Sequence, residues 1–246
     1  MNRKLAENFK RVQGRIEAAC ARTGRDPAEV RLVVVTKAVS LDVIKHLVDC
    51  GIKHLGESRV QDLTKRAAMT HEYLSRRQRD PAAGALSRPN WHMIGHLQRN
   101  KVKALLPWVD LIHSVDSLRL AEEIDREAEA LGRTVDVLME INAGLEPQKY
   151  GVPVAAAVHL AEQIKSLPRL HLIGVMAMAP LDTNLERIRG CFSRVREVFE
   201  EMRHQAVRRD EFRELSMGMS NDFEVAVECG STTLRVGTAL FEGVTL

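Results

Sequence analysis

The first 24 residues carry apolar side chains three to four positions apart, which is the spacing of one face of a helix. These residues are Leu5, Phe9, Val12 and Ile16. From residue 31 the pattern changes to short apolar runs separated by longer amphipathic segments. Such runs, rich in valine, are typical of strands that are buried on both faces. We therefore expect an N-terminal helix over 1–24, followed by alternating strands and helices.

Eight strands are predicted in this series. They lie at residues 31–36, 52–55, 91–94, 110–114, 135–141, 170–178, 214–217 and 233–236. Each strand after the first is reached through a segment long enough for a helix. Predicted helices lie at 41–49, 58–69, 116–131, from Pro153 onward, at 184–206 and at 221–228. Ser40 and Ser220 are in position to cap two of these helices at their starts.

Residues 70–90 interrupt the alternation. They are polar and basic, and they contain two prolines and a glycine. We expect an exposed loop there, or a frayed extension of the preceding helix.

The number of strands predicts the fold class. Eight strands joined by helices within about 250 residues are typical of a (β/α)₈ TIM barrel. We expect one domain over residues 1–246, with the N-terminal helix as an addition to the barrel. A doubly wound parallel sheet is the alternative, although it usually has fewer strands.

Composition and charge exclude several classes of protein. Lys and Arg number 36 against 33 Asp and Glu, a formal net charge of +3, so the basic face of a nucleic-acid-binding domain is not expected. No apolar run approaches the roughly 20 residues needed to cross a bilayer, and the start lacks the apolar segment of a signal peptide. The four cysteines form no CxxC pair, which disfavours a zinc site or a disulfide framework. A cytoplasmic protein without membrane or nucleic-acid partners is expected.

Lys37 is the most distinctive of the polar residues that follow the predicted strands. Barrels place their active sites at this end of the strands, and Lys37 follows three valines at the end of the first one. Burial of an amine at the mouth of an apolar barrel favours its neutral form, which can react with an aldehyde. The alternative is a lysine that forms an ion pair with Glu57 or another acid.

Two loops near the end of the chain have the composition of an anion site. Residues 216–220 (SMGMS) lead from the seventh strand into a helix, and residues 235–238 (RVGT) leave the eighth. Small residues let backbone N–H groups approach an anion, and barrels often bind phosphate in these two loops. With an imine-forming lysine, such a site points to pyridoxal 5′-phosphate or to an aldolase acting on a sugar phosphate. Ordinary turns and a helix cap are the alternative.

Arg235 favours pyridoxal phosphate. It lies two residues before Gly237, so both share one face of the strand. Because a guanidinium keeps its protons, it would donate a hydrogen bond to a pyridine nitrogen and weaken the ring as an electron sink. The alternative is a salt bridge inside the barrel with Glu140 or Glu214.

Two other patterns are weaker. His92 and His96 have the spacing of metal ligands on a helix, but they flank the end of a strand, so a metal is disfavoured. Four methionines resemble a lining of the mouth, although adaptable packing is the simpler explanation. They are Met176, Met178, Met217 and Met219.

Seven segments resemble, in order and spacing, the pyridoxal phosphate homeostasis protein family (the YggS/PROSC family). They are VVVTKAVS, HLGESRVQD, WHMIGHLQRNKVK, IHSVDS, INAGLEPQKYGV, GVMAM and LSMGMSNDFEVAVECGSTTLRVGTALFEG. The likeness covers nearly the whole chain. It implies the barrel of alanine racemase-like, fold-type III pyridoxal phosphate proteins, without their second β domain.

The resemblance implies a role for each matching residue. Lys37 matches the lysine that binds pyridoxal 5′-phosphate as an internal aldimine, and Arg235 matches the arginine that faces the pyridine nitrogen. The positions on the phosphate side are Ser216, Met217, Gly218, Gly237 and Thr238. Ser58 stands where the family commonly has an asparagine, so its shorter side chain is expected to reach the cofactor only through water.

The implied function is to hold pyridoxal phosphate and to buffer or deliver it to apo enzymes, without turnover. Racemases of this fold use a tyrosine as a second base, and this chain has only Tyr73 and Tyr150. Without a base on the opposite face of the cofactor, a racemase lacks one of the two groups that it needs to move a proton at the substrate carbon. A small racemase or decarboxylase is the alternative. We expect a monomer, because a closed barrel needs no partner to complete its sheet.

A third hypothesis is a protein-interaction or RNA-binding module. It would use Arg76, Arg77, Arg79 and the pair Arg208 and Arg209. No aromatic residue is interleaved with these basic residues, which disfavours single-stranded nucleic acid as a ligand.

Overall fold

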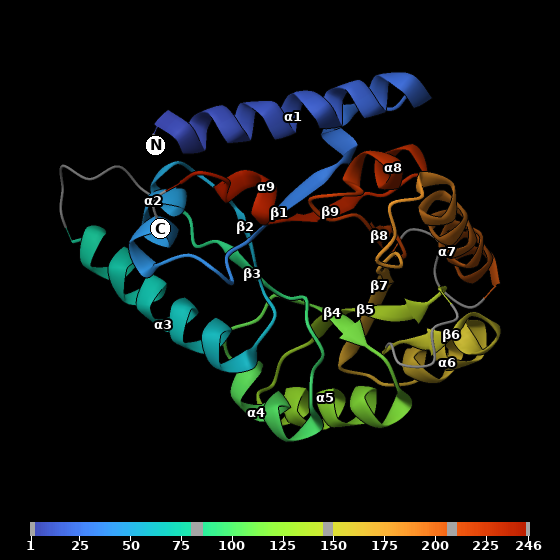
Figure 1. Cartoon of the computed structure of the whole chain (residues 1–246). Coiled ribbons are helices and arrows are strands. Elements are labelled where there is room, and N and C mark those ends of the chain that lie inside the picture. Colours follow the sequence, from blue (N-terminus) through green and yellow to red (C-terminus); the bar gives the residue numbers. More distant parts are fainter. Residues whose placement is uncertain (1–2, 80–85, 145–149, 206–210, 245–246) are drawn as a thin grey trace.

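Eight parallel strands close into a barrel in the computed structural model of the protein, which describes residues 3–79, 86–144, 150–205 and 211–244 (Figure 1). The strands are β1 (Arg31–Val35), β2 (His54–Glu57), β3 (Asn90–Met93), β4 (Leu111–Val115), β5 (Val135–Asn142), β7 (Leu170–Ala177), β8 (Glu214–Ser216) and β9 (Thr233–Val236). A two-residue strand, β6 (Val152–Pro153), pairs with the end of β5.

The barrel closes because its strands pair in one continuous ring. The order is β1-β2-β3-β4-β5-β7-β8-β9, and β9 pairs back to β1. The register of this last pairing runs from Arg31 opposite Thr233 to Val34 opposite Val236. The TIM barrel predicted from the sequence is therefore confirmed, and the alternative of an open doubly wound sheet is ruled out.

Helices cover the outside of this barrel. They are α1 (Arg3–Thr23), α2 (Leu41–Asp49), α3 (Val60–Arg77), α4 (Val102–Leu105), α5 (Leu118–Ala130), α6 (Ala157–Lys165), α7 (Leu185–Gln205), α8 (Phe223–Glu228) and α9 (Thr238–Phe241). Short 3₁₀ helices lie at Pro27–Glu29, Arg99–Lys101 and Val154–Ala156. No helix among the described residues is long and apolar enough to cross a membrane.

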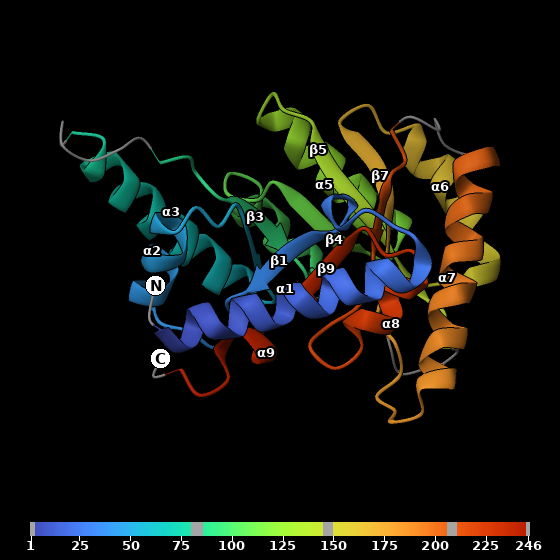
Figure 2. The same cartoon turned by 90° about the horizontal axis from the view of Figure 1, so that it is seen from above.

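The predicted N-terminal helix is confirmed as α1, which lies across α8 and α9 on the outside of the barrel (Figures 1 and 2). Asn8 donates hydrogen bonds to the carbonyl oxygens of Leu240 and Glu242, at 3.0 and 2.8 Å. Arg15 forms an ion pair with Glu224 at 2.7 Å. Helix α1 thus packs against the last two helices of the chain.

Helix α3 is longer than the sequence suggested. It continues to Arg77, so residues 70–77 form an extension of the helix, one of the two structures expected for 70–90, and an exposed loop over 70–77 is wrong. The reason is that Leu74 is buried in the core and Tyr73 packs against the same core, within a segment whose other side chains are mostly polar. These polar neighbours hid the helical periodicity. Part of the expected loop, 80–85, lies outside the described residues.

Several other elements begin later than predicted, β2 and α6 among them. Strand β2 runs over His54–Glu57 instead of residues 52–55. Helix α6 begins at Ala157 instead of near Pro153, because Val152 and Pro153 pair with β5 first.

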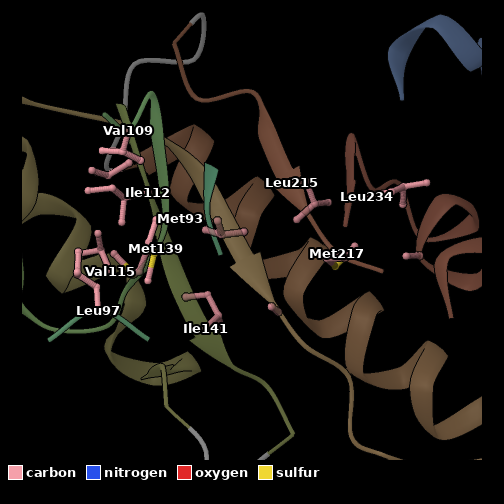
Figure 3. Close-up of a cluster of buried hydrophobic side chains, with 14 of the residues drawn as sticks. Met93, Leu97, Val109, Ile112, Val115, Met139, Ile141, Leu215, Met217 and Leu234 are labelled. Carbon is pink, nitrogen blue, oxygen red and sulfur yellow. The ribbon is translucent and has the colours of Figure 1, made fainter. Parts of the chain in front are cut away.

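The main apolar core lies between the strands and the helices. Met93, Ile112 and Met139 belong to this outer layer (Figure 3). Alternation along the strands sends the other set of side chains into the barrel. There the apolar cluster is small, formed by Leu111, Leu138, Ile173 and Met176 with Met178, and much of the remaining interior is polar.

Gly174 on β7 is fixed by the close approach of β8. A Cβ atom at this position would lie 1.8 Å from the carbonyl oxygen of Glu214. Gly174→Ala is therefore expected to lower the free energy of unfolding by about 3 kcal/mol, the upper range for overpacking. Gly190→Ala is the matched control, since a Cβ there on α7 meets nothing within 4 Å and alanine favours a helix by about 0.5–1 kcal/mol. Urea unfolding of both variants measures the difference, and equal stabilities would contradict this packing.

Candidate functional site

The loops that follow β1 and β9 lie side by side at the mouth of the barrel, the end formed by the carboxyl ends of the strands. Val33 lies opposite Arg235 in the β1–β9 pair, so the two strands end next to each other. A Cβ atom on Gly237 would lie 3.1 Å from the carbonyl oxygen of Val35. The turn that carries Lys37 therefore begins beside Gly237.

Arg235 and Ser216 form the buried part of this mouth. Arg235 is 3% exposed and Ser216 is fully buried. The Nη1 group of Arg235 donates hydrogen bonds to Oγ and to the carbonyl oxygen of Ser216, at 2.6 and 2.9 Å, and Nη2 donates to the carbonyl oxygen of Ala177 at 3.0 Å. Three of the five N–H groups of the guanidinium are used in this way.

The guanidinium of Arg235 stays charged inside the barrel. Burial lowers its pKa to about 10, against the opposing effect of the nearby Asp222 and Glu140, so the group is cationic at neutral pH. Within the described residues, the acceptors that hold it are a hydroxyl and carbonyl oxygens. The alternative of a salt bridge with Glu214 is ruled out, because Glu214 binds Arg31 at 2.8 Å instead. A buried cation held in this way favours an anionic or electron-rich ligand.

Glu140 is a second buried titratable group at the same end of the barrel. It is 3% exposed. Burial and repulsion from Asp116 raise its pKa to about 7, although Arg235 acts in the opposite direction. Its carboxyl group therefore changes charge near neutral pH. Sequence reasoning considered Glu140 only as a partner for Arg235.

Gly218 gives the loop after β8 its sharp turn. Its φ angle is +91°, and a Cβ atom would lie 2.6 Å from Cβ of Ala226 and 2.9 Å from Cα of Phe223. Its carbonyl oxygen accepts a hydrogen bond from the backbone N–H of Arg235 at 3.0 Å. Only glycine fits this position, and the loop is thereby tied to β9.

Ser220 does not cap the helix that follows it, contrary to the prediction. Helix α8 begins at Phe223 with Asp222 at its start. The Oγ atom of Ser220 instead accepts hydrogen bonds from the backbone N–H groups of Gly237 and Ala239, at 3.4 and 3.2 Å. Ser220 thus joins the two loops predicted to form an anion site. Sequence reasoning missed this role because the contact joins two loops that lie after different strands.

Lys37 is exposed in the turn that follows β1, so the burial expected for its amine is absent. The alternative of an ion pair between Lys37 and Glu57 is also ruled out. Glu57 is fully buried, where it accepts hydrogen bonds from Thr36 and Arg66. Arg66 on α3 also donates to the carbonyl oxygens of Thr36 and Val39. These bonds bracket Lys37 and hold its turn against the barrel.

Ser58 and Met217 contribute less directly to the mouth of the barrel than Arg235 and Ser216 do. Ser58 follows β2 and is half-buried, and Gly95 packs so closely that a Cβ there would lie 2.3 Å from the carbonyl oxygen of Ser58. The side chain of Met217 is buried in the outer core with Leu234 (Figure 3). Its backbone N–H donates to the carbonyl oxygen of Thr233 at 3.1 Å. The structure therefore gives Met217 a packing role, while Gly237 and the exposed Thr238 border the mouth.

The four methionines do not form one lining. Met176 and Met178 belong to the inner apolar cluster, whereas Met217 lies in the outer core. Met219 is 37% exposed. Packing at separate places accounts for them.

His92 and His96 also lie in different surroundings. His92 is buried inside the barrel, where it bonds other histidines. His96 lies 3.3 Å from Asp116 and stacks on Tyr150, with ring centroids 3.8 Å apart. Among the described residues, no group of three His, Cys, Asp or Glu side chains is placed to hold a metal ion.

The basic residues considered for RNA binding are in part engaged elsewhere. Arg76 forms an ion pair with Glu72, and Arg77 forms one with Asp49 at 2.9 Å. The pair 208–209 lies outside the described residues.

The chain belongs to the alanine racemase N-terminal domain family, whose model matches residues 4–244. Within that class it is similar to curated pyridoxal phosphate homeostasis proteins. The one from Aquifex aeolicus is 39% identical over 235 residues, which cover 96% of each chain. The family resemblance inferred from the sequence motifs is therefore confirmed.

Two solved structures share this fold. An unknown protein from Bifidobacterium adolescentis has a TM-score of 0.88 and 38% identity, covering 97% of this chain and 95% of that one. PipY of Synechococcus elongatus with PLP bound has a TM-score of 0.74 and 33% identity, covering 92% of this chain and 99% of that one.

Glu140→Gln is expected to remove a pH-dependent destabilisation. Because the pKa of Glu140 is raised from 4.5 to about 7, the folded protein retains a proton there that the unfolded chain has lost. The contribution of this group to stability is present below pH 4.5 and is lost as the pH rises through 7. Relative to the unmodified protein, the variant should gain about 2–3 kcal/mol in free energy of unfolding between pH 5 and pH 8.

Urea unfolding at the two pH values measures this gain. Glu201→Gln is the control, because Glu201 is exposed on α7 and its replacement should leave the pH dependence unchanged. A Glu140→Gln variant whose stability runs parallel to that of the unmodified protein would contradict the raised pKa.

Proposed function

We propose that this protein binds pyridoxal 5′-phosphate covalently through Lys37 and buffers or delivers it to apo enzymes in the cytoplasm. The observation that carries the proposal is that three features lie together at the mouth of the barrel. These are the Lys37 turn, the buried Arg235 cation and the two loops joined by Ser220. The barrel closes its own sheet, which supports a monomer.

The residues present fit this cofactor. A Cβ atom would clash at Gly218 and would pack tightly at Gly237, so both loops carry backbone without a side chain at these positions. Thr238 is exposed beside them and adds a hydroxyl. When bound, pyridoxal phosphate supplies an aldehyde carbon that forms a carbon–nitrogen double bond with an amine and releases water. The exposed amine of Lys37 is open to such a reaction.

Each residue then has a defined task. Arg66 holds the turn of Lys37 through the carbonyl oxygens of Thr36 and Val39. The loops after β8 and β9 would bind the phosphate through Ser216, Gly218, Gly237 and Thr238. The backbone of Met217 continues this loop, and Ser58 would contact the cofactor through water.

Arg235 explains why turnover is not part of the proposal. Its pKa of about 10 keeps it protonated, so it would donate a hydrogen bond to the ring nitrogen of a bound cofactor, and that nitrogen would stay without a proton. A ring in this state accepts electrons poorly from a substrate carbon. Tyr73 does not serve as a base at the mouth of the barrel, because its hydroxyl donates to Asp49 between α2 and α3.

A small racemase or decarboxylase is the second candidate function. It is favoured by one observation, the stacking of Tyr150 on His96 beside Asp116. These groups could exchange protons near the barrel mouth. The two candidates differ in whether amino acids are consumed or inverted.

Lys37→Ala is expected to abolish covalent capture of the cofactor. The purified protein is incubated with pyridoxal phosphate, its near-visible absorbance is recorded, and the product is reduced with borohydride and mapped by mass spectrometry. We expect an absorbance band and a label on Lys37. Lys65→Ala is the control, since Lys65 is an exposed lysine on α3 and its loss should change neither. A label scattered over surface lysines would refute the assignment.

Amino-acid assays separate a carrier from an enzyme. The loaded protein is incubated with L- and D-amino acids in deuterium oxide. A carrier leaves the Cα hydrogen and the amino-acid composition unchanged. Steady exchange or product formation that is lost in Lys37→Ala would establish the second candidate instead.

Thr238→Val tests the phosphate loops. The substitution keeps the shape of the side chain but removes its hydroxyl. A hydrogen bond to a charged group contributes about 1.5–3 kcal/mol, so the affinity for pyridoxal phosphate is expected to fall by about tenfold or more. Thr183→Val, at another exposed threonine, should bind as the unmodified protein does. Equilibrium dialysis measures both, and an unchanged affinity of Thr238→Val would exclude this contact.

A further inference from the structure

A chain of polar contacts crosses the barrel interior from its amino-terminal end to the mouth. His54 Nδ1 lies 3.0 Å from His92 Nε2, and His92 Nδ1 lies 2.9 Å from His113 Nε2. His113 Nδ1 then lies 3.0 Å from Oγ of Ser216, which also accepts a hydrogen bond from Arg235 at 2.6 Å. We name the three rings the histidine relay.

The strand registers place the rings of the histidine relay in a rising series. His92 lies opposite Gly56, two residues beyond His54. His92 also pairs with Leu111, two residues before His113. Since alternate residues of a strand share a face, each ring stands one step nearer the mouth than the ring before it.

The hydrogen bonds of the histidine relay must all run in the same direction along the three rings. Burial, assisted by neighbouring His and Arg groups, holds the pKa values of His92 and His113 well below their usual range, so both rings are neutral. A neutral imidazole donates from one nitrogen and accepts at the other. Because each contact joins Nδ1 of one ring to Nε2 of the next, the three rings carry their protons all on Nδ1 or all on Nε2.

These two arrangements give Ser216 opposite roles. With the protons on Nε2, the Ser216 hydroxyl must donate to His113. With the protons on Nδ1, His113 donates to Ser216, as Arg235 does in both arrangements. The hydroxyl hydrogen of Ser216 is then available to an anion at the mouth.

We propose that the histidine relay couples His54 at one end of the barrel to anion binding by Ser216 at the other. The inference rests on the proposed role of Ser216 in phosphate binding. An anion that accepts from Ser216 selects the Nδ1 arrangement. Addition of a second proton to His54 selects the same arrangement, because the doubly protonated ring can only donate to His92. Anion binding and protonation of His54 therefore strengthen each other by the same factor.

The change of arrangement is balanced in protons. Starting from the Nε2 arrangement, Ser216 passes its proton to Nδ1 of His113 and regains one from water. His113 and His92 each pass their Nε2 proton to the next ring. His54 releases its Nε2 proton to water. Each group ends with as many protons as it began with.

His54 is the end of the relay that can exchange protons with solvent, because it is only half-buried. Burial and Arg31 lower its pKa, with a smaller contribution from Lys53, whereas Glu214 and Asp110 oppose the shift. Within the described residues these are the charged groups that act on it. His92 and His113, being fully buried, follow the state of His54.

Nitrogen NMR of the apo protein tests the relay directly. Long-range ¹H–¹⁵N spectra of histidine-labelled protein distinguish the Nδ1–H and Nε2–H forms of each ring. We expect saturation with inorganic phosphate to move His54, His92 and His113 together to the Nδ1–H form. Rings that keep their forms when phosphate is bound, or that change separately, would overturn the inference.

A binding titration tests the coupling to His54. Sulfate is the probe because it remains a dianion between pH 5.5 and 7.5. All proteins carry Glu140→Gln, which removes a buried carboxyl group whose pKa of about 7 lies within this pH range. Sulfate affinity is expected to rise about fivefold or more toward pH 5.5, and this rise should vanish in the His54→Phe variant. His159→Phe, at an exposed position on α6, should retain it.

These outcomes also separate the inference from the proposed function. A label on Lys37 with phosphate bound but unchanged histidine forms refutes only the relay. Histidine forms that respond to phosphate without a label on Lys37 refute only the cofactor assignment. A His54→Phe variant that keeps the full pH dependence of sulfate affinity refutes the coupling, even when the NMR forms change.

Discussion

The backbone pairing between β1 and β9 is the constraint on which the site depends. It closes the barrel with strands from the two ends of the chain. The same register sets Arg235 opposite Val33 and brings Gly237 against Val35. A slip of one residue would turn the guanidinium of Arg235 into the apolar layer under the helices. One set of hydrogen bonds thus fixes both the closure of the fold and the position of the buried cation.

The division of the molecule into an apolar outer layer and a polar interior follows from this closure. Strand residues such as Ile112 and Met139 pack against the helices, and burial of apolar surface there stabilises the fold. The interior is left to hydrogen-bonded groups, among them the pair of Arg31 and Glu214. Because buried polar groups are costly unless they are paired, the interior adopts a defined network.

The sequence predicted local features well and contacts between distant segments poorly. Valine-rich runs located the strands and helical spacing located the helices, and at β2 only the bounds of the strand were misplaced. The roles of Ser220 and His92 were not visible, because their partners lie on other strands or loops. Lys37 was placed at the right end of its strand, but its exposure depends on how the following turn folds. That turn is fixed by Arg66, whose position no local pattern reveals.

The hydrogen bonds from Arg66 to the turn of Lys37 hold the first two βα units of the barrel together. Arg66 lies on α3 and holds the carbonyl oxygens of Thr36 and Val39, while Glu57 at the end of β2 fixes Arg66 in turn. A lysine loop transplanted alone into another barrel would lose this anchor. Circular permutants opened between β1 and α3 would separate its parts on the chain. A chimeric barrel that is to keep the turn of Lys37 in place therefore has to include residues 31–77 as one segment.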